Sequence, residues 1–124
     1  MKFLLMIYTD DSLLEALPEG AFDRMMHGCI THADELKAQG TLIESQQLEH
    51  GSAARTVRVR DGKTRIVDGP FAETKELLGG YNLIEADSLD EAVRIAQEFP
   101  WIGTGSIEVR PVRDFGEVRR RVGA

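Results

Sequence analysis

The chain of 124 residues has few cysteines, aromatic residues and histidines. Its one cysteine, Cys29, cannot form a disulfide within the chain, so the cytoplasm is the expected location. Two of the three histidines, His27 and His32, are spaced so that they point to different sides of a helix, and His50 lies far along the chain in an expected loop. Without a cluster of cysteines or histidines, we expect no metal site and no cofactor.

Positive charge and long apolar runs are also scarce. The 15 Lys and Arg are outnumbered by 21 Asp and Glu, and the formal net charge is −6. This balance excludes broad, direct binding to nucleic acid, which needs a basic surface. No apolar run approaches the roughly 18 residues of a membrane helix, so we expect no membrane association. The apolar start, residues 3–8, is followed by Asp10 and Asp11 without a cleavage site, and therefore indicates a buried strand and not a signal peptide.

The spacing of apolar residues predicts the order strand, helix, strand, hairpin, strand, helix, strand. The expected strands are residues 3–8, 41–48, 81–86 and 107–112. The first helix carries one apolar stripe, and the second, residues 88–99, begins with a capping box of Ser88 and Glu91. This order predicts an α+β fold: a ferredoxin-like antiparallel sheet with both helices on one face and an extra β-hairpin. Residues 1–115 form one domain, and residues 116–124 are expected to be a loose tail. The stripe of the first helix is Phe22, Met25, Met26, Cys29, Ala33 and Leu36.

The hairpin is predicted from Asp61-Gly62 between two alternating runs. A two-residue turn places Arg60 opposite Lys63 and Arg55 opposite Asp68, the latter as an ion pair at the edge of the core. One face of the hairpin is then apolar, and the other gathers four cations. That cationic face is either a solvated surface or a surface that meets acidic groups, from Glu44 and Glu49, from a second subunit or from an anionic ligand. The apolar face is Val57, Val59, Thr64 and Ile66, and the cationic face is Arg58, Arg60, Lys63 and Arg65.

The segment that follows the hairpin carries a specific motif. Residues 67–76 read Val-Asp-Gly-Pro-Phe-Ala-Glu-Thr-Lys-Glu, and Leu-Gly-Gly-Tyr follows at 78–81. This segment resembles the Asp-Gly-Pro-Phe signature of the DGPF-type branch of the YCII-related proteins. Residues 2–8, the first hairpin strand with its turn and residues 109–112 resemble the same family.

The resemblance implies a bacterial, cytoplasmic protein with a ferredoxin-like α+β fold that pairs into a homodimer, a dimeric α+β barrel. It also implies a functional link to an extracytoplasmic-function sigma factor, in a branch whose biochemical role is largely undefined. For the wider family a His–Asp pair has been proposed as the active site. Here Cys29 takes the matching histidine position and Phe99-Pro100 the matching Asp-Pro position, so that pair is not carried over.

The signature segment is either a well-made connector or a ligand-binding loop at the mouth of a pocket. Phe71 is expected to anchor it in the core, and Glu73 and Glu76 are expected to share a face of one helical turn. Cys29 is expected to be a buried, inert thiol. His32 is expected to be a partly buried structural histidine, although it is also the weak candidate for a catalytic base. The candidate ligand-binding residues are Tyr8, His32, Asp68, Glu73, Lys75 and Tyr81.

Three functions stay open from the sequence. The first is a dimeric protein that binds or senses a small molecule between helix and sheet, alongside a sigma factor. The second is a small enzyme that uses acid–base catalysis on a small organic substrate. The third is a dimeric interaction module without a ligand. The fold does not choose among them, because ferredoxin-like scaffolds carry many functions.

Overall fold

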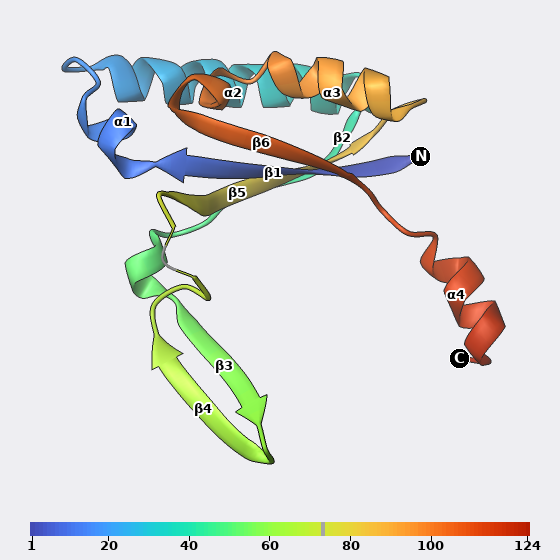
Figure 1. The fold of residues 1–124 in the computed structure, drawn as a ribbon. Helices are drawn as coiled ribbons and strands as arrows, with labels where there is room; N and C mark the ends of the chain where they lie inside the picture. The colour runs from blue at the N-terminus through green and yellow to red at the C-terminus, as the bar shows by residue number, and fades with distance from the viewer. Residues whose placement is uncertain (73) are drawn as a thin grey trace.

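The computed structural model describes residues 1–72 and 74–124. Figure 1 shows a layer of helices over one face of a sheet, with two segments that extend from the body on the other side. The elements follow one another as β1 (Lys2–Asp10), α1 (Asp11–Glu15), α2 (Ala21–Ala38), β2 (Leu42–Gln47), η1 (Gly51–Ala53), β3 (Arg55–Arg60), β4 (Lys63–Asp68), β5 (Glu76–Glu85), α3 (Leu89–Gln97), η2 (Pro100–Thr104), β6 (Gly105–Pro111) and α4 (Phe115–Val122), where η marks a 3₁₀ turn.

The main sheet has the strand order β2-β5-β1-β6, and each neighbouring pair is antiparallel. The long helices α2 and α3 lie on the same face of this sheet (Figure 1). This arrangement confirms the predicted α+β class, the ferredoxin-like strand order and the inserted hairpin β3–β4. The core lies between the helices and the sheet, where Phe3 and Leu5 of β1 and Ile84 of β5 are fully buried.

The two long helices bury only part of the stripes that their periodicity predicts, since Phe22 of α2 and Leu89 of α3 are exposed. Leu36 of α2 packs in the main core cluster, and Cys29 packs with Ile7 and Trp101 in a second cluster. The backbone N–H of Glu91 donates to the Ser88 hydroxyl over 3.1 Å, which confirms the predicted cap of α3. Each helix therefore turns its apolar stripe toward the sheet and its charged side toward solvent.

A glycine pair lets β5 approach its neighbours closely. A Cβ atom on Gly80 would lie 2.7 Å from the main-chain carbonyl oxygen of Gln46 in β2, and one on Gly79 would lie 3.2 Å from the Thr9 side chain in β1. Because real Cβ atoms do not approach backbone oxygens this closely, only glycine fits at residue 80 without moving β2. The glycine pair thus permits a close approach of strands within the sheet.

The hairpin β3–β4 has the predicted register, with Arg60 opposite Lys63 and Arg55 opposite Asp68. The Arg55 Nε atom lies 3.0 Å from Asp68 Oδ1, so the predicted ion pair also forms. The hairpin nevertheless extends away from the body as a separate two-stranded sheet. Its apolar face is open to solvent, with Val57 64% and Ile66 68% exposed. The expectation that the Arg55–Asp68 pair lies at the edge of the core is therefore wrong.

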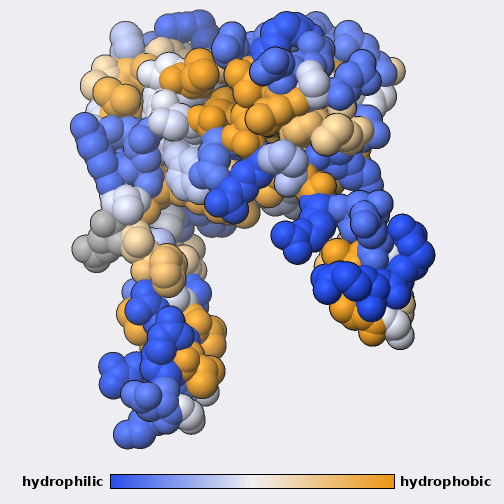
Figure 2. Space-filling view, turned by 45° about the vertical axis from the view of Figure 1, so that its right-hand side comes forward, coloured by the Kyte–Doolittle hydropathy of each residue, from blue (hydrophilic) through white to orange (hydrophobic). Residues whose placement is uncertain are grey.

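The C-terminal residues expected to be a loose tail form the helix α4. The Asp114 side chain caps this helix by accepting hydrogen bonds from the backbone N–H groups of Gly116 and Glu117. Figure 2 shows apolar side chains exposed on both extended segments, the hairpin and α4. On α4 these include Phe115 and Val122. We call the hairpin and α4 the two arms.

The signature segment departs from its predicted form at two residues. Phe71 is 72% exposed and does not anchor the loop in the core; its ring instead lies beneath the Arg58 guanidinium, 4.8 Å from ring centroid to Cζ. Glu76 begins β5 and does not belong to a helical turn, because its backbone pairs with Asp10 of β1. The turn expected to place Glu73 beside it involves a residue outside the described part of the chain.

Candidate functional site

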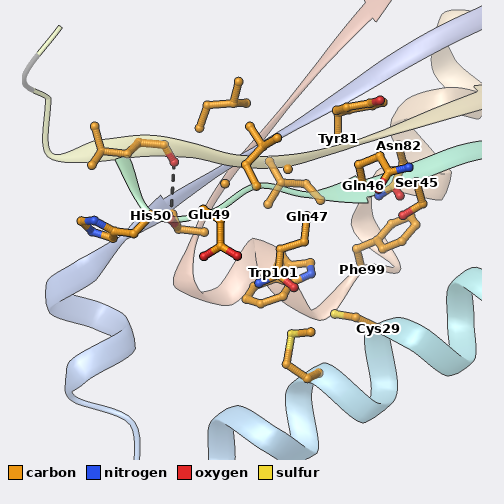
Figure 3. Close-up of a pocket in the computed structure, with 18 of the residues that line it drawn as sticks. Cys29, Ser45, Gln46, Gln47, Glu49, His50, Tyr81, Asn82, Phe99 and Trp101 are labelled. Carbon is orange, nitrogen blue, oxygen red and sulfur yellow. Dashed lines mark hydrogen bonds between the residues drawn. The ribbon is translucent and has the colours of Figure 1, made fainter. Parts of the chain in front are cut away.

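A pocket of about 260 Å³ lies between α2 and the main sheet, toward the C-terminal end of β1. Figure 3 shows side chains from the sheet, from α2 and from the segment after α3 converging on it. Its volume lies just below the range of about 300–1,000 Å³ that is usual for ligand pockets, which suits a small molecule. The strands and the β2–β3 connection supply mostly polar groups, and the helix side supplies apolar ones.

The apolar wall of the pocket is formed around Trp101. This side chain comes from η2, and the Phe22 ring of α2 meets it edge to face, with 6.1 Å between centroids. Met26 and Cys29 of α2 complete the wall. Burial raises the pKa of the Cys29 thiol, so this group stays protonated and apolar near neutral pH. The wall can hold the flat apolar part of a ligand, and Cys29 is buried as predicted.

The inner polar group of the pocket is Asn82 of β5. The strand register pairs Asn82 with Leu5, and both side chains face the helix layer. Asn82 is only 3% exposed, yet its side-chain amide forms no hydrogen bond within the described residues. Because Asn82 lines the pocket, its amide faces the pocket space. A ligand in the pocket could supply a hydrogen-bond partner for this amide.

The mouth of the pocket is closed on one side by an Asp–His pair. His50 Nε2 lies 2.8 Å from Asp11 Oδ2, and the backbone N–H of Ser52 donates to His50 Nδ1 over 3.1 Å. In the neutral ring, Nδ1 therefore accepts and Nε2 donates its proton to Asp11. Both ring nitrogens are engaged, so His50 ties α1 to the β2–β3 connection and has no free nitrogen for a ligand.

The two predicted tyrosines lie on the sheet face away from the helices. Tyr8 follows Ile7 in β1, and since Ile7 faces the helix layer, Tyr8 faces the other side. Tyr81 borders the pocket, but its ring lies on the far side of the sheet (Figure 3) and its hydroxyl donates to Glu44 over 3.0 Å. The bond to Glu44 raises the pKa of Tyr81. Neither hydroxyl points into the pocket.

The other predicted site residues are dispersed. His32 packs edge to face on the Phe99 ring, and its Nε2 atom lies 3.3 Å from Glu98 Oε2. Asp68 pairs with Arg55 on the exposed hairpin. Lys75 Nζ lies 3.7 Å from the buried carboxylate of Asp10. Glu73 lies outside the described residues. Among the predicted residues that the structure describes, Tyr81 alone borders the pocket.

The pocket residues that no signal in the sequence marks come from distant parts of the chain. Asp11 and His50 are 39 residues apart, and neither belongs to a motif. Gln46 and Asn82 lay in expected strands, 41–48 and 81–86, with no functional role expected for either. Within the described residues, no group of three acidic, histidine or cysteine side chains could hold a metal ion. In the same part of the chain, no helix is long and apolar enough to cross a membrane.

Comparison with known proteins gives the family. The uncharacterised protein R00369 of Rhizobium meliloti (strain 1021) is 37% identical over 114 residues, which cover 90% of this chain and 92% of that protein. Among solved structures, the chain is similar to 5-chloro-2-hydroxyhydroquinone dehydrochlorinase (TftG) from Burkholderia phenoliruptrix AC1100 in complex with 2,5-dihydroxybenzoquinone. That likeness has a TM-score of 0.47 at 15% identity, over 91% of this chain and 94% of that one. The model of the YCII-related domain matches residues 1–116, and the chain belongs to this family.

Proposed function

We propose that this protein binds a small molecule in the pocket between α2 and the sheet. The observation that carries the proposal is a preformed pocket of about 260 Å³ with an aromatic wall and the Asn82 side chain in its lining. Pockets of this kind, apolar with a few placed polar groups, are the usual form of small-molecule sites. A well-packed core would have filled this space.

Fluorescence of Trp101 tests the proposal directly, because it is the only tryptophan in the chain and lines the pocket. We expect compounds from a metabolite and fragment library to shift its emission and to raise the melting temperature Tm together. The blocking variant is Cys29→Phe, which places a ring in the pocket. The matched control is His27→Phe, which adds the same ring on the exposed side of α2. A library that gives no coincident hit, or hits that Cys29→Phe leaves unchanged, would exclude this site.

An acid–base enzyme is the second candidate, and the carboxylate of Glu49 is the observation that favours it. Figure 3 shows Glu49 beside the space that a ligand would occupy, where it could take a proton from a bound substrate. His50 is held by Asp11 and Ser52, and His32 does not line the pocket. If hits from the library are converted to product, Glu49→Gln should abolish turnover and retain binding. Compounds that bind but are not converted would exclude the enzyme and leave a protein that only binds its ligand.

We also propose that the protein forms a homodimer, the dimeric α+β barrel that the family resemblance implies. The sheet face away from the helices carries the half-buried side chains of Leu4, Met6 and Leu83, which no described element covers. A dimer formed through this face is compatible with ligand binding in the pocket. The third hypothesis, an interaction module without a ligand, would use the dimer interface and not the pocket. Light scattering should give the mass of two chains, and Leu83→Glu should reduce it to one.

The signature loop is a candidate ligand segment in such a dimer, because in one chain Asp68 and Lys75 lie outside the pocket lining. The double variant Glu73→Ala/Lys75→Ala should weaken ligand binding only if the loop takes part. The finer assignments also stay proposals: the DGPF-type branch, the bacterial cytoplasm and the functional link to a sigma factor. A deletion strain that leaves the sigma factor's target transcripts unchanged would remove that link.

A further inference from the structure

The charges around the pocket are of one sign. Its lining, within the described residues, contains no lysine or arginine, and its carboxylates are Asp11 and Glu49. Asp11 is occupied by His50, whereas Glu49 forms no ion pair with any described residue. Lys75 pairs with Asp10 outside the lining. A ligand therefore enters a negative potential that no nearby side chain of the pocket offsets.

The polar groups lie at two ends of the pocket with the aromatic wall between them. Figure 3 shows Glu49 toward one end, near the mouth, and Asn82 toward the other, with Trp101 between them. The indole of Trp101 can stack on a flat apolar group, and its face attracts a positive charge. The Asn82 amide can both donate and accept one hydrogen bond to a hydroxyl or carbonyl group.

We propose that the ligand of this pocket is a small organic cation: an amine on an aromatic or compact apolar body, with a hydroxyl or carbonyl at the opposite end. Glu49 takes the ammonium group, Trp101 the body, and Asn82 the far polar group. This inference rests on the proposed binding function and adds the chemical class of the ligand. A body of about ten non-hydrogen atoms suits a pocket of about 260 Å³.

An anionic ligand is the alternative that the pocket disfavours. Carboxylates and phosphates are bound in proteins by arginine, lysine or helix N-termini, which supply the opposite charge. The cationic face of the chain, which includes Arg58 and Arg65, lies on the hairpin arm and away from this pocket. An anion beside Glu49 would instead meet a like charge and lose its own hydration.

Three probes that share one body and differ in charge test the inference. Tyramine carries an ammonium group, tyrosol a neutral hydroxyl, and 3-(4-hydroxyphenyl)propionate a carboxylate, each on the same hydroxyphenylethyl body. Titrations of the full chain, read by Trp101 fluorescence and by calorimetry, should rank the affinities in that order. At low salt we expect tyramine to bind about fivefold more tightly than tyrosol, since an exposed carboxylate contributes modestly.

Two charge-matched variants locate the effect. Glu49→Gln should remove most of the tyramine preference and improve binding of the propionate, whereas Glu35→Gln, an exposed carboxylate of α2 outside the lining, should leave the ranking unchanged. Equal or tighter binding of tyrosol or the propionate overturns the inference and keeps the binding function. So does an equal response of the two variants. If none of the three probes binds while library compounds do, the ligand class is wrong; if nothing binds at all, the binding function itself fails.

Discussion

The body of the molecule and its two arms use the same sequence patterns with opposite results. In the body, the alternating residues of β1 and β5 turn one side into the helix layer, and Phe3, Leu5 and Ile84 are fully buried. In the hairpin arm an equally regular alternation leaves Ile66 68% exposed. The patterns are local, but burial requires a second layer, and within one chain the arms have none.

This contrast separates folding from association. A two-stranded hairpin and a helix as short as α4 are marginal when isolated in water. The described body, by contrast, closes around its own core. We therefore expect the body to set the stability of the single chain, and the arms to gain order from whatever covers them. In the proposed homodimer that cover is a second copy.

Truncation of one isoleucine in each region gives the largest expected difference. Ile84→Ala opens a cavity in the core and should lower the free energy of unfolding by about 2–5 kcal/mol. Ile66→Ala removes a similar group from the open face of the hairpin and should change the free energy of unfolding by less than about 0.5 kcal/mol. Urea unfolding at low protein concentration measures both.

The pair of variants also reports on the arms. If Ile66→Ala becomes destabilising as the protein concentration rises, the hairpin is covered in an assembly, because dimer stability depends on concentration. Equal losses for the two variants at every concentration would contradict the division into body and arms.

Two glycines sharpen the comparison at the backbone. Gly80→Ala places a Cβ atom 2.7 Å from the Gln46 carbonyl oxygen and must push β2 away, at a cost of about 3 kcal/mol. Gly62→Ala, in the hairpin turn, meets no atom within 4 Å, and its φ of +75° makes only local strain, about 1 kcal/mol. Thermal unfolding should rank the variants in this order. A larger effect at residue 62 would show that the arm supports the body.

The sequence predicts the elements of the body and of the hairpin arm, but it does not predict which of them lack a covering layer. Asp61-Gly62 predicts the hairpin and its register, because the turn requires positive φ at both residues, and both have it. The Phe22–Leu36 stripe predicts which side of α2 is buried. The sequence does not show that Val57 and Ile66 lack a covering layer, since alternation specifies a face and not its neighbour.

The pocket was harder to foresee for a similar reason. Its walls join Asp11, His50 and Trp101, which only the folded topology brings together. The signature segment instead drew attention to Asp68 and Lys75, whose partners in the single chain, Arg55 and Asp10, are ordinary ion-pair partners. The end of the motif, residues 78–81, does line the pocket, but most of the polar groups there come from residues outside the motif.

Helix caps test the same comparison with smaller effects. Ser88→Ala removes the cap of α3, whose Ala92 and Ile95 are buried in the core, and should cost about 1 kcal/mol. Asp114→Ala removes the cap of α4, which extends from the body. It should reduce helical circular dichroism slightly and leave unfolding followed by Trp101 fluorescence unchanged. A shift of that unfolding curve with Asp114→Ala would place α4 in the cooperative unit.

The smallest expected effect is a dependence on pH that belongs to the body alone. The Ser12 hydroxyl and backbone N–H donate to Asp10 over 2.6 and 2.9 Å, and these bonds hold the pKa of the Asp10 carboxyl below its usual value although burial opposes them. Because the folded pKa is lowered, the stabilisation is complete above the unfolded pKa of about 3.9 and is lost as pH falls through the folded value. Asp10→Asn should therefore lower Tm by roughly 3 °C at pH 7, and the difference should shrink as pH falls below the unfolded pKa and vanish below the folded one. On the hairpin, Asp68→Asn should leave Tm at pH 7 nearly unchanged, since its partner Arg55 is exposed and such pairs contribute little. Equal effects of the two variants at pH 7 would show that the hairpin carries as much of the stability as the strand end of β1.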